Sequence, residues 1–491
     1  MRFDTLALTS SAVASMVASA SAACADFEIL RRNSPSLRAR APTSEQDAAN
    51  ETLTEECKLY NFAPVTTLFN NGGFPTLWET ANLSLPDASV IVIHICSKNR
   101  NRKATAEDKA LFTALSSSIP NIAPRGTRAG DFTGVTYDIA ADPACWWTDT
   151  LCTQPKIAAL KADVTRCPEP ETWGFTLDDG PNCSHNAFYD YLYEQKQKAT
   201  LFYIGSNVVD WPYEAQRGLD DGHEICAHTW SHPYMTALTN EEVFSELYYS
   251  MKAIKSVIGV TVRCWRPPYG DVDDRVRYIA QALGLTTVVW SDNTFDYDIS
   301  TLGTATIEAN YNAILTEQSN GTFARQGTIV LTHELNNGTM SESKSFLPKI
   351  KSQFKAVVPI AVCYNNSQPY VETDYTYPNF AQFTAGTTSI SLATATATSG
   401  PVLSIPLSTG QTGSLVVPLS YTIAHAANNA AATTTGSGSS ATATGSASGS
   451  RTSATSTAKA SAAQSLSSNG VGYIMGLLTL GAFVVGALLV W

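Results

Sequence analysis

Between residues 165 and 370 the chain alternates short β-rich runs with segments of helical periodicity. This alternation predicts a parallel sheet joined by crossover helices, either open or closed into a barrel. The predicted strands are 173–177, 199–204, 223–227, 261–265, 286–290, 327–331 and 356–362. The clearest helix follows Thr239, which is predicted to form a capping box with Glu242. Its apolar residues recur at helical spacing and are assigned to the core: Val243, Leu247, Met251, Ile254 and Ile258.

Polar residues directly follow five of the predicted strands. In parallel α/β proteins, chemistry is built at the carboxyl ends of the strands. Each polar group alone has a plain structural explanation, such as a turn, a surface helix or a core histidine. Their recurrence at successive strand ends favours a common site. In chain order the residues are Asp178, Asp179, His228, His232, Arg266, Tyr269, Asp296 and His333.

Three of these residues form a candidate metal site. His228 and His232 are spaced to lie on one face of a helical turn, and zinc favours such a pair. Asp179 adds a carboxylate, which gives the three protein ligands typical of a catalytic zinc site. The sequence therefore predicts that Asp179, His228 and His232 bind a metal ion.

The other residues supply acid–base chemistry. Asp178 is the candidate general base, and Arg266 is predicted to hold it charged and oriented. His333, on another strand, is the candidate general acid, with Asp296 orienting its imidazole. The backbone N–H of Tyr269 is a candidate oxyanion donor. Together these groups predict metal-assisted hydrolysis of an acyl bond.

The motifs "TLDDGP", "HTWSH", "RPPYG", "WSDNTFDY" and "LTHE", in this order, closely resemble those of the NodB-type polysaccharide deacetylases (carbohydrate esterase family four) and, within them, the fungal chitin deacetylases. The resemblance covers about residues 165–365. It implies a distorted, incomplete (β/α) barrel, a Zn²⁺ or Co²⁺ ion, and an amide hydrolase that converts chitin to chitosan and acetate. It implies the residue roles given above, and it places Leu331 in the acetyl pocket.

The fourth motif departs from the family pattern Asp-x-x-Asp-Trp. This chain has Asn293 at the first position and Tyr297 in place of the tryptophan, while Asp296 is kept. The change puts in question the wall of the acetyl pocket and its local support. Tyr297 is expected to contact substrate at this wall. Because the metal ligands are intact, we expect an active enzyme. The alternatives are a deacetylase of acetylxylan or peptidoglycan, or an inactive wall protein that binds chitin.

The flanking segments predict export. Residues 1–22 are predicted to be a signal peptide, and residues 23–164 an irregular N-terminal extension that packs on the domain at 165–370. Residues 371–469 are predicted to be a disordered, O-glycosylated Ser/Thr-rich stalk. The apolar segment 470–491 lacks a basic flank, which favours a GPI-anchor signal over a membrane-spanning helix. We expect a secreted monomer that is GPI-anchored at the plasma membrane and cell wall.

The cysteines and sequons fit that compartment. Ten cysteines predict disulfides, and a Cys167–Cys363 bridge would staple the ends of the catalytic domain. Candidate glycosylation sites are Asn50, Asn82, Asn182, Asn320, Asn337 and Asn365. A glycan on Asn182 must point away from the site, and a disulfide at Cys183 is expected to fix that direction. The net charge of −11 argues against nucleic acid as a partner.

Overall fold

The computed structural model of the chain describes residues 106–183, 185–373, 375–387, 391–392, 403–407 and 411–415. The predicted signal peptide, the anchor segment, Asn50 and Asn82 lie outside these residues. Within the described part of the chain, no helix is both long and apolar enough to cross a bilayer.

A curved parallel sheet forms the centre of the fold, with the strand order β5-β4-β3-β2-β1-β7-β6 and with β8 also paired to β1. Every residue of β1 is buried, because helices cover the outside of the sheet and side chains fill its inside. The strands are β1 Thr172–Asp178, β2 Thr200–Tyr203, β3 Glu224–Ala227, β4 Cys264–Trp265, β5 Thr286–Thr287, β6 Asp292–Asn293, β7 Thr328–Leu331 and β8 Ala356–Val358.

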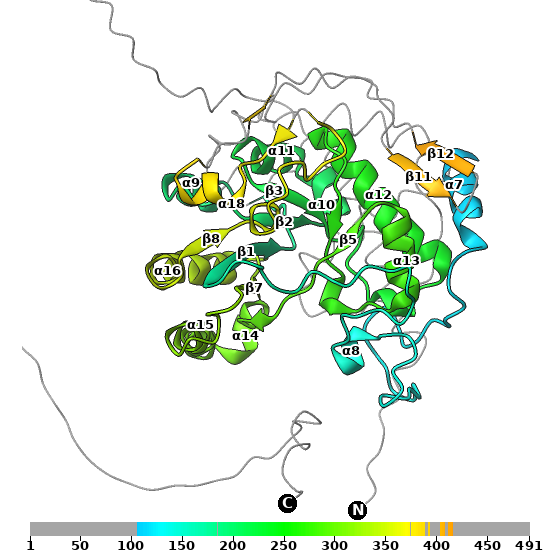
Figure 1. Cartoon of the computed structure of the whole chain (residues 1–491), viewed down its shortest axis with the longest axis horizontal. Coiled ribbons are helices and arrows are strands. Elements are labelled where there is room, and N and C mark those ends of the chain that lie inside the picture. The colour runs from blue at the N-terminus through cyan, green and yellow to red at the C-terminus, as the bar shows by residue number, and fades with distance from the viewer. Residues whose placement is uncertain are drawn as a thin grey trace, which may run out of the picture. The chain divides into compact units, whose positions relative to one another are not determined.

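Helices surround this sheet, with α9, α15 and α16 on the left of Figure 1 and α12 and α13 on the right. The helix predicted after Thr239 is confirmed as α12, with its capping box formed and its five predicted core residues buried. The helices are α9 Asn186–Glu194, α10 Gly205–Asp210, α11 Pro212–Asp220, α12 Asn240–Ile258, α13 Asp274–Ala282, α14 Ile299–Leu302, α15 Thr304–Ser319, α16 Asn337–Gln353 and α17 Ile360–Cys363. Short 3₁₀ turns are η1 Met235–Ala237, η2 Pro268–Gly270 and η3 Asp296–Asp298.

The two edge strands of the sheet, β5 and β6, are joined by residues 288–291 alone. A link of this length spans at most about 18 Å, so the edges must approach each other and the sheet must curl. Among the described residues no ladder joins β5 to β6. The predicted incomplete barrel is therefore confirmed, and its curl brings the carboxyl ends of the strands around one mouth.

Two features of the sheet differ from the sequence-based expectation. The range 356–362 is not one strand, because Pro359 ends β8 and caps the short helix α17. Strand β6 was missed, since its two polar residues, Asp292 and Asn293, carry no alternating apolar signal.

The flanks of the domain are also more ordered than predicted. The N-terminal extension contains the helices α7 Ala106–Ser116 and α8 Trp147–Thr150. The fold continues past residue 370: Tyr375 and Tyr377 are buried, and Tyr377 donates a hydrogen bond to the His223 carbonyl (2.6 Å). These tyrosines lie at the start of the range 371–469, whose Ser/Thr-rich average composition predicted a disordered stalk. Later elements are β9 Tyr375–Thr376, α18 Phe380–Thr384, β10 Ser391–Leu392, β11 Leu403–Leu407 and β12 Gln411–Leu415.

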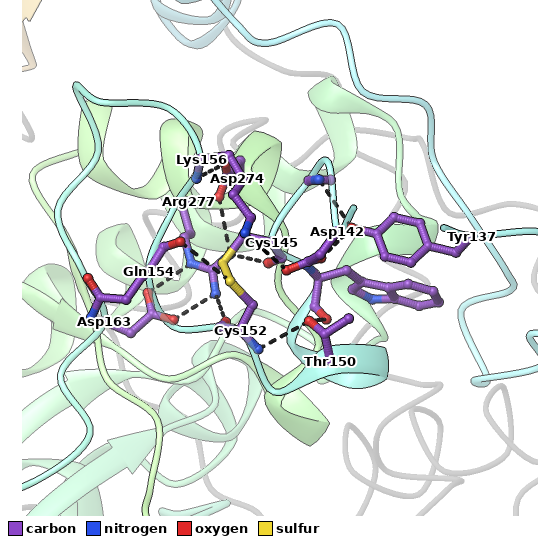
Figure 2. Close-up of a disulfide and its surroundings, with 12 residues drawn as sticks. Tyr137, Asp142, Cys145, Thr150, Cys152, Gln154, Lys156, Asp163, Asp274 and Arg277 are labelled. Carbon is purple, nitrogen blue, oxygen red and sulfur yellow. Dashed lines mark hydrogen bonds and ion pairs between the residues drawn. A yellow bond between two sulfur atoms is a disulfide. The ribbon is translucent and has the colours of Figure 1, made fainter. Parts of the chain in front are cut away.

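Part of the N-terminal extension is fastened to α13 around the disulfide Cys145–Cys152 (Figure 2). The guanidinium of Arg277 donates hydrogen bonds to the carbonyls of both cysteines, at 2.6 and 2.7 Å. It also forms an ion pair with Asp163 (2.7 Å), and Asp274 accepts a hydrogen bond from the Lys156 amide (2.7 Å). These contacts fix the segment against the domain at 165–370.

Two more disulfides join pairs of described cysteines in the domain. Cys226–Cys264 joins β3 to β4, and Cys167–Cys363 links residues 196 apart in sequence. The latter is the pair that the sequence suggested as a staple for the ends of the domain. It connects the segment before β1 to α17, which packs against β1.

We expect the double change Cys167→Ser and Cys363→Ser to lower the free energy of unfolding by about 2–5 kcal/mol. The reason is that this bridge closes a long loop and so removes much of the entropy of the unfolded chain. Urea unfolding measures the change. The control, Cys145→Ser with Cys152→Ser, opens a bridge of sequence separation 7 and should cost less. A larger loss in the control would contradict the expectation.

Candidate active site

The strand β1 ends in the two aspartates. Asp178 is its last residue and pairs with His333 in a parallel bridge that extends the β1–β7 ladder. Asp179 leaves the strand with a φ of 76°, a left-handed conformation that is uncommon for a residue with a side chain. Strict strand alternation would send the two carboxylates to opposite faces. The change in backbone direction allows both side chains to reach the same histidine, His228.

The predicted metal ligands are brought together. Asp179 Oδ1 lies 3.4 Å from His228 Nε2 and 3.3 Å from His232 Nε2. His228 Nδ1 lies 2.8 Å from the Arg266 carbonyl. Because a carbonyl only accepts, Nδ1 carries the proton and the lone pair of Nε2 faces Asp179. Burial alone would raise the pKa of Asp179, but electrostatic attraction by the His232 and His333 imidazoles holds it below the usual range.

This cluster fits a divalent metal ion. Asp179 Oδ1 is buried and has no hydrogen-bond partner, so a buried carboxylate oxygen is left for another ligand. One donor atom each from Asp179, His228 and His232 lies within 4.8 Å of the others. A carboxylate and two imidazoles are a zinc-type donor set. The tautomer of His228, fixed by the carbonyl behind it, is the arrangement that metal-binding histidines use.

The loop that carries the two histidines is not the helical turn that the spacing predicted. Thr229 and His232 have φ values of 63° and 58°, and residues 228–234 contain no helix. The carboxylate of Glu246, on α12, holds the loop instead. It accepts hydrogen bonds from the Trp230 and Ser231 amides (2.8 Å each) and from the Ser231 hydroxyl (2.6 Å).

Glu246 was missed by the sequence reasoning. It is fully buried, although its residue type predicts a solvent-facing position. The available signal was its place on α12, three residues after Val243 and next to Leu247. A carboxylate within an apolar stripe requires a partner inside the protein.

Arg266 contacts the other aspartate. Its Nη1 donates to Asp178 Oδ1 (2.7 Å) and to the Thr176 hydroxyl (2.9 Å). The guanidinium is fully buried and lies over the ring of Phe202, 4.2 Å from its centroid. Because both charges of the Asp178–Arg266 pair are removed from water, loss of either side chain would leave an uncompensated buried charge.

His333 and Asp296 form a second buried pair. The Asp296 carboxylate accepts one hydrogen bond from the His333 amide (2.8 Å) and is 2.7 Å from His333 Nδ1. Burial alone would lower the pKa of His333, but the charge of Asp296 and this hydrogen bond raise it to about 9. The imidazole is therefore protonated at neutral pH, as a general acid requires.

The altered fourth motif is supported by a local hydrogen bond. Asn293 Oδ1 accepts a hydrogen bond from the Phe295 amide (2.7 Å), which supports the turn that leads into Asp296. The ring of Tyr297 meets the His333 ring edge-on, 5.2 Å away, and is 41% exposed. Leu331 is buried at the end of β7, two residues before His333.

Tyr269 lies beside the predicted metal ligand His232. Its ring stacks on Tyr234, with centroids 4.0 Å apart and planes at 3°, and it meets His232 edge-on at 4.6 Å. The residue has a φ of 58° and is 46% exposed. Tyr234 was missed, because nothing in the sequence pairs it with Tyr269.

The sequons that the structure describes are accessible to different degrees. Asn320, Asn337 and Asn365 are exposed, whereas Asn182 is partly buried. Cys183 is disulfide-bonded, as expected. The Asn182 side chain accepts a hydrogen bond from the Cys183 amide (2.7 Å), so it is directed along its own loop.

Comparison with known proteins places this site in a family. A sequence model of the polysaccharide deacetylases matches residues 165–288. Chitin deacetylase 2 of Cryptococcus neoformans var. grubii is 50% identical over 381 residues, which cover 76% of this chain and 79% of the relative. The chain belongs to the polysaccharide deacetylase family.

Another relative of the deacetylase is the chitin deacetylase of Amylomyces rouxii, 48% identical over 341 residues, or 69% of this chain and 76% of the relative. Among solved structures, the chitin deacetylase of Colletotrichum lindemuthianum has a TM-score of 0.39 at 23% identity. The match covers 42% of this chain and 92% of that one.

We expect Glu246→Gln to weaken Zn²⁺ binding by the deacetylase about 10–100-fold, because the neutral amide keeps one acceptor oxygen where the carboxylate uses two to hold the histidine loop. Competition titration with a zinc indicator measures the affinity. The control is Glu241→Gln, an exposed position in the first turn of the same helix. Equal affinities for the two variants would show that the loop does not depend on Glu246.

Proposed function

We propose that the deacetylase hydrolyses the N-acetyl groups of N-acetylglucosamine residues in chitin, giving chitosan and acetate. The observation that carries the proposal is the pairing of Asp178 with His333 at adjacent strand ends beside the three-ligand cluster. One of these groups is charge-paired with Arg266 and the other with Asp296. A base and an acid beside a metal site are the groups that amide hydrolysis needs.

Asp179, His228 and His232 would hold the ion, for which Zn²⁺ and Co²⁺ are the candidates. A bound divalent ion supplies Lewis-acid chemistry, lowering the pKa of water and polarising a carbonyl oxygen. Two observations support this assignment: the buried oxygen of Asp179 that has no hydrogen-bond partner, and the tautomer of His228 that presents the lone pair of Nε2.

The protein groups then divide the proton transfers. Asp178 takes a proton from the attacking water, whose oxygen bonds to the acetyl carbon, and Arg266 orients the carboxylate and balances its charge. His333 donates its proton to the amide nitrogen as the C–N bond breaks, and Asp296 stabilises the imidazolium until then. The products are acetate and the free amine.

The remaining predicted residues surround the acetyl group. The backbone N–H of Tyr269 donates to the oxyanion, while Leu331 and Tyr297 form the wall beside His333. Three partly exposed aromatic rings, those of Tyr269, Phe295 and Tyr297, flank the site. Such rings suit the apolar faces of sugar units. The names of the relatives favour chitin over acetylxylan or peptidoglycan.

We further propose that the deacetylase acts outside the cell as a GPI-anchored monomer on its own cell wall. The disulfides of the described residues and the exposed sequons fit an oxidising, secretory environment. The anchor segment and residues 416–469 of the stalk lie outside the described residues. Release of the protein from membranes by a phosphatidylinositol-specific phospholipase tests the anchor.

Asp178→Asn should lower acetate release from chitin oligomers about 10²–10⁴-fold, since the amide cannot accept a proton. Zinc content should stay near that of the unchanged protein, because Asp178 is not one of the three ligands. The control is Glu308→Gln, an exposed carboxylate on α15. Parallel assays with acetylxylan and peptidoglycan identify the preferred polymer. Full activity of Asp178→Asn would refute this mechanism.

Asp296→Asn should shift the alkaline limb of the kcat–pH profile to lower pH. Asp296 raises the pKa of His333 to about 9. Without its charge, burial lowers that pKa, so the acid loses its proton at a lower pH. Rates measured between pH 5 and 10 locate the limb. An unchanged limb accompanied by a normal rate would mean that His333 is not the general acid.

A further inference from the structure

The conformation of Tyr269 requires support from outside its own loop. Its φ of 58° and ψ of 9° lie in the left-handed region, which costs of order 1 kcal/mol or more for a residue with a side chain. Such a conformation persists only where the surroundings determine it. The backbone N–H of this residue is the proposed oxyanion donor, so its direction depends on that conformation.

The N-terminal extension supplies one contact through Tyr234. The Tyr234 amide donates to the Arg128 carbonyl (3.2 Å), and Phe132 meets the Tyr234 ring edge-on at 5.5 Å. A Cβ added at Gly130 would lie 2.4 Å from that ring, so the backbone packs directly against it. Tyr234 in turn is the platform on which Tyr269 stacks.

A second contact reaches the residue after Tyr269. Trp147 packs on Gly270 so closely that an added Cβ would lie 2.2 Å from its ring. The Trp147 amide donates to the Val272 carbonyl (3.0 Å). The indole also meets Trp290 at 4.8 Å, and Trp290 borders the guanidinium of Arg266.

Asp271, fully buried, ties these parts together. Its carboxylate accepts hydrogen bonds from the Trp146 indole (2.9 Å), the Thr148 hydroxyl (2.6 Å) and the Thr236 amide (2.7 Å). One side chain therefore joins the extension, the Tyr269 loop and the turn that follows the histidine loop. The disulfide Cys145–Cys152 and Arg277 anchor the far side of the same segment (Figure 2).

We infer that residues 128–148, the N-terminal cradle, position the Tyr269 backbone for the reaction. Trp147 and Phe132 are its main positioning residues, and they act through Gly270 and Tyr234. The inference rests on the proposed role of the Tyr269 N–H. It assigns the extension a positioning role in catalysis, in addition to packing against the barrel.

The test compares Trp147→Ala, Trp147→Phe and Phe132→Leu in the full chain, using chitin oligomers as substrate. Loss of one oxyanion donor costs about 10²–10³ in kcat, so misplacing it in Trp147→Ala should lower kcat at least about tenfold. KM, zinc content and the pH limbs should stay near the unchanged values, because substrate contacts, metal ligands and the acid–base pair are untouched. Trp147→Phe should recover most of the rate. The control is Leu302→Ala, an exposed residue at the end of α14 that lies outside the cradle.

The outcomes separate this inference from the proposed function. If the unchanged protein releases no acetate, the proposed function fails. If the unchanged protein is active, and folded Trp147→Ala and Phe132→Leu both have a kcat within twofold of its value, the positioning role of the cradle is overturned while the proposed function stands. A rate loss that parallels zinc loss also overturns it, because that pattern marks a structural role. Should Trp147→Ala not fold, Trp147→Phe and Phe132→Leu decide: reduced kcat with normal zinc supports the cradle, and unchanged kcat overturns it.

Discussion

The curl of the parallel sheet is the constraint on which the rest of the structure depends. Because only residues 288–291 join the edge strands β5 and β6, the edges are held close and every strand points its carboxyl end into one mouth. Side chains from strands that are not adjacent in the sheet then become neighbours, as with Asp178 on β1 and Arg266 after β4, whose atoms lie 2.7 Å apart. A flat sheet of the same strands would spread these side chains along an edge.

Within that mouth, each functional side chain has one polar atom held by a buried partner. Its other polar atom stays available for the metal ion or the substrate. Arg266 holds one oxygen of Asp178. Asp296 contacts Nδ1 of His333, which leaves Nε2 as the nitrogen that can donate a proton to the substrate. The Arg266 carbonyl contacts Nδ1 of His228, which leaves Nε2 for the metal ion. Arg266 thus serves two groups, the guanidinium supporting the base and the backbone supporting a metal ligand. A substitution at this position removes the guanidinium and leaves the carbonyl in place.

A layer behind the site controls its backbone. Asp179, Thr229, His232, Tyr269 and Phe295 all have positive φ, and they belong to four of the loops around the mouth. Each needs outside support: Glu246 holds the histidine loop, and the N-terminal cradle contacts the loop of Tyr269. The supporting residues come from a helix and from an extension that contain none of the recognised motifs.

The sequence by itself determined the class of fold, the helix after Thr239 and the motif residues, because periodicity and strand-end polarity are local signals. Short polar β6, buried Tyr377 and the helix α17 escaped it, since tertiary pairing overrode weak local propensity. Only the tertiary structure decided that the two histidines leave a non-helical loop, that Glu246 is buried beneath it, and that Trp147 packs on Gly270. Those facts join residues between 15 and 123 positions apart, and no local pattern records which distant side chain will complete a contact.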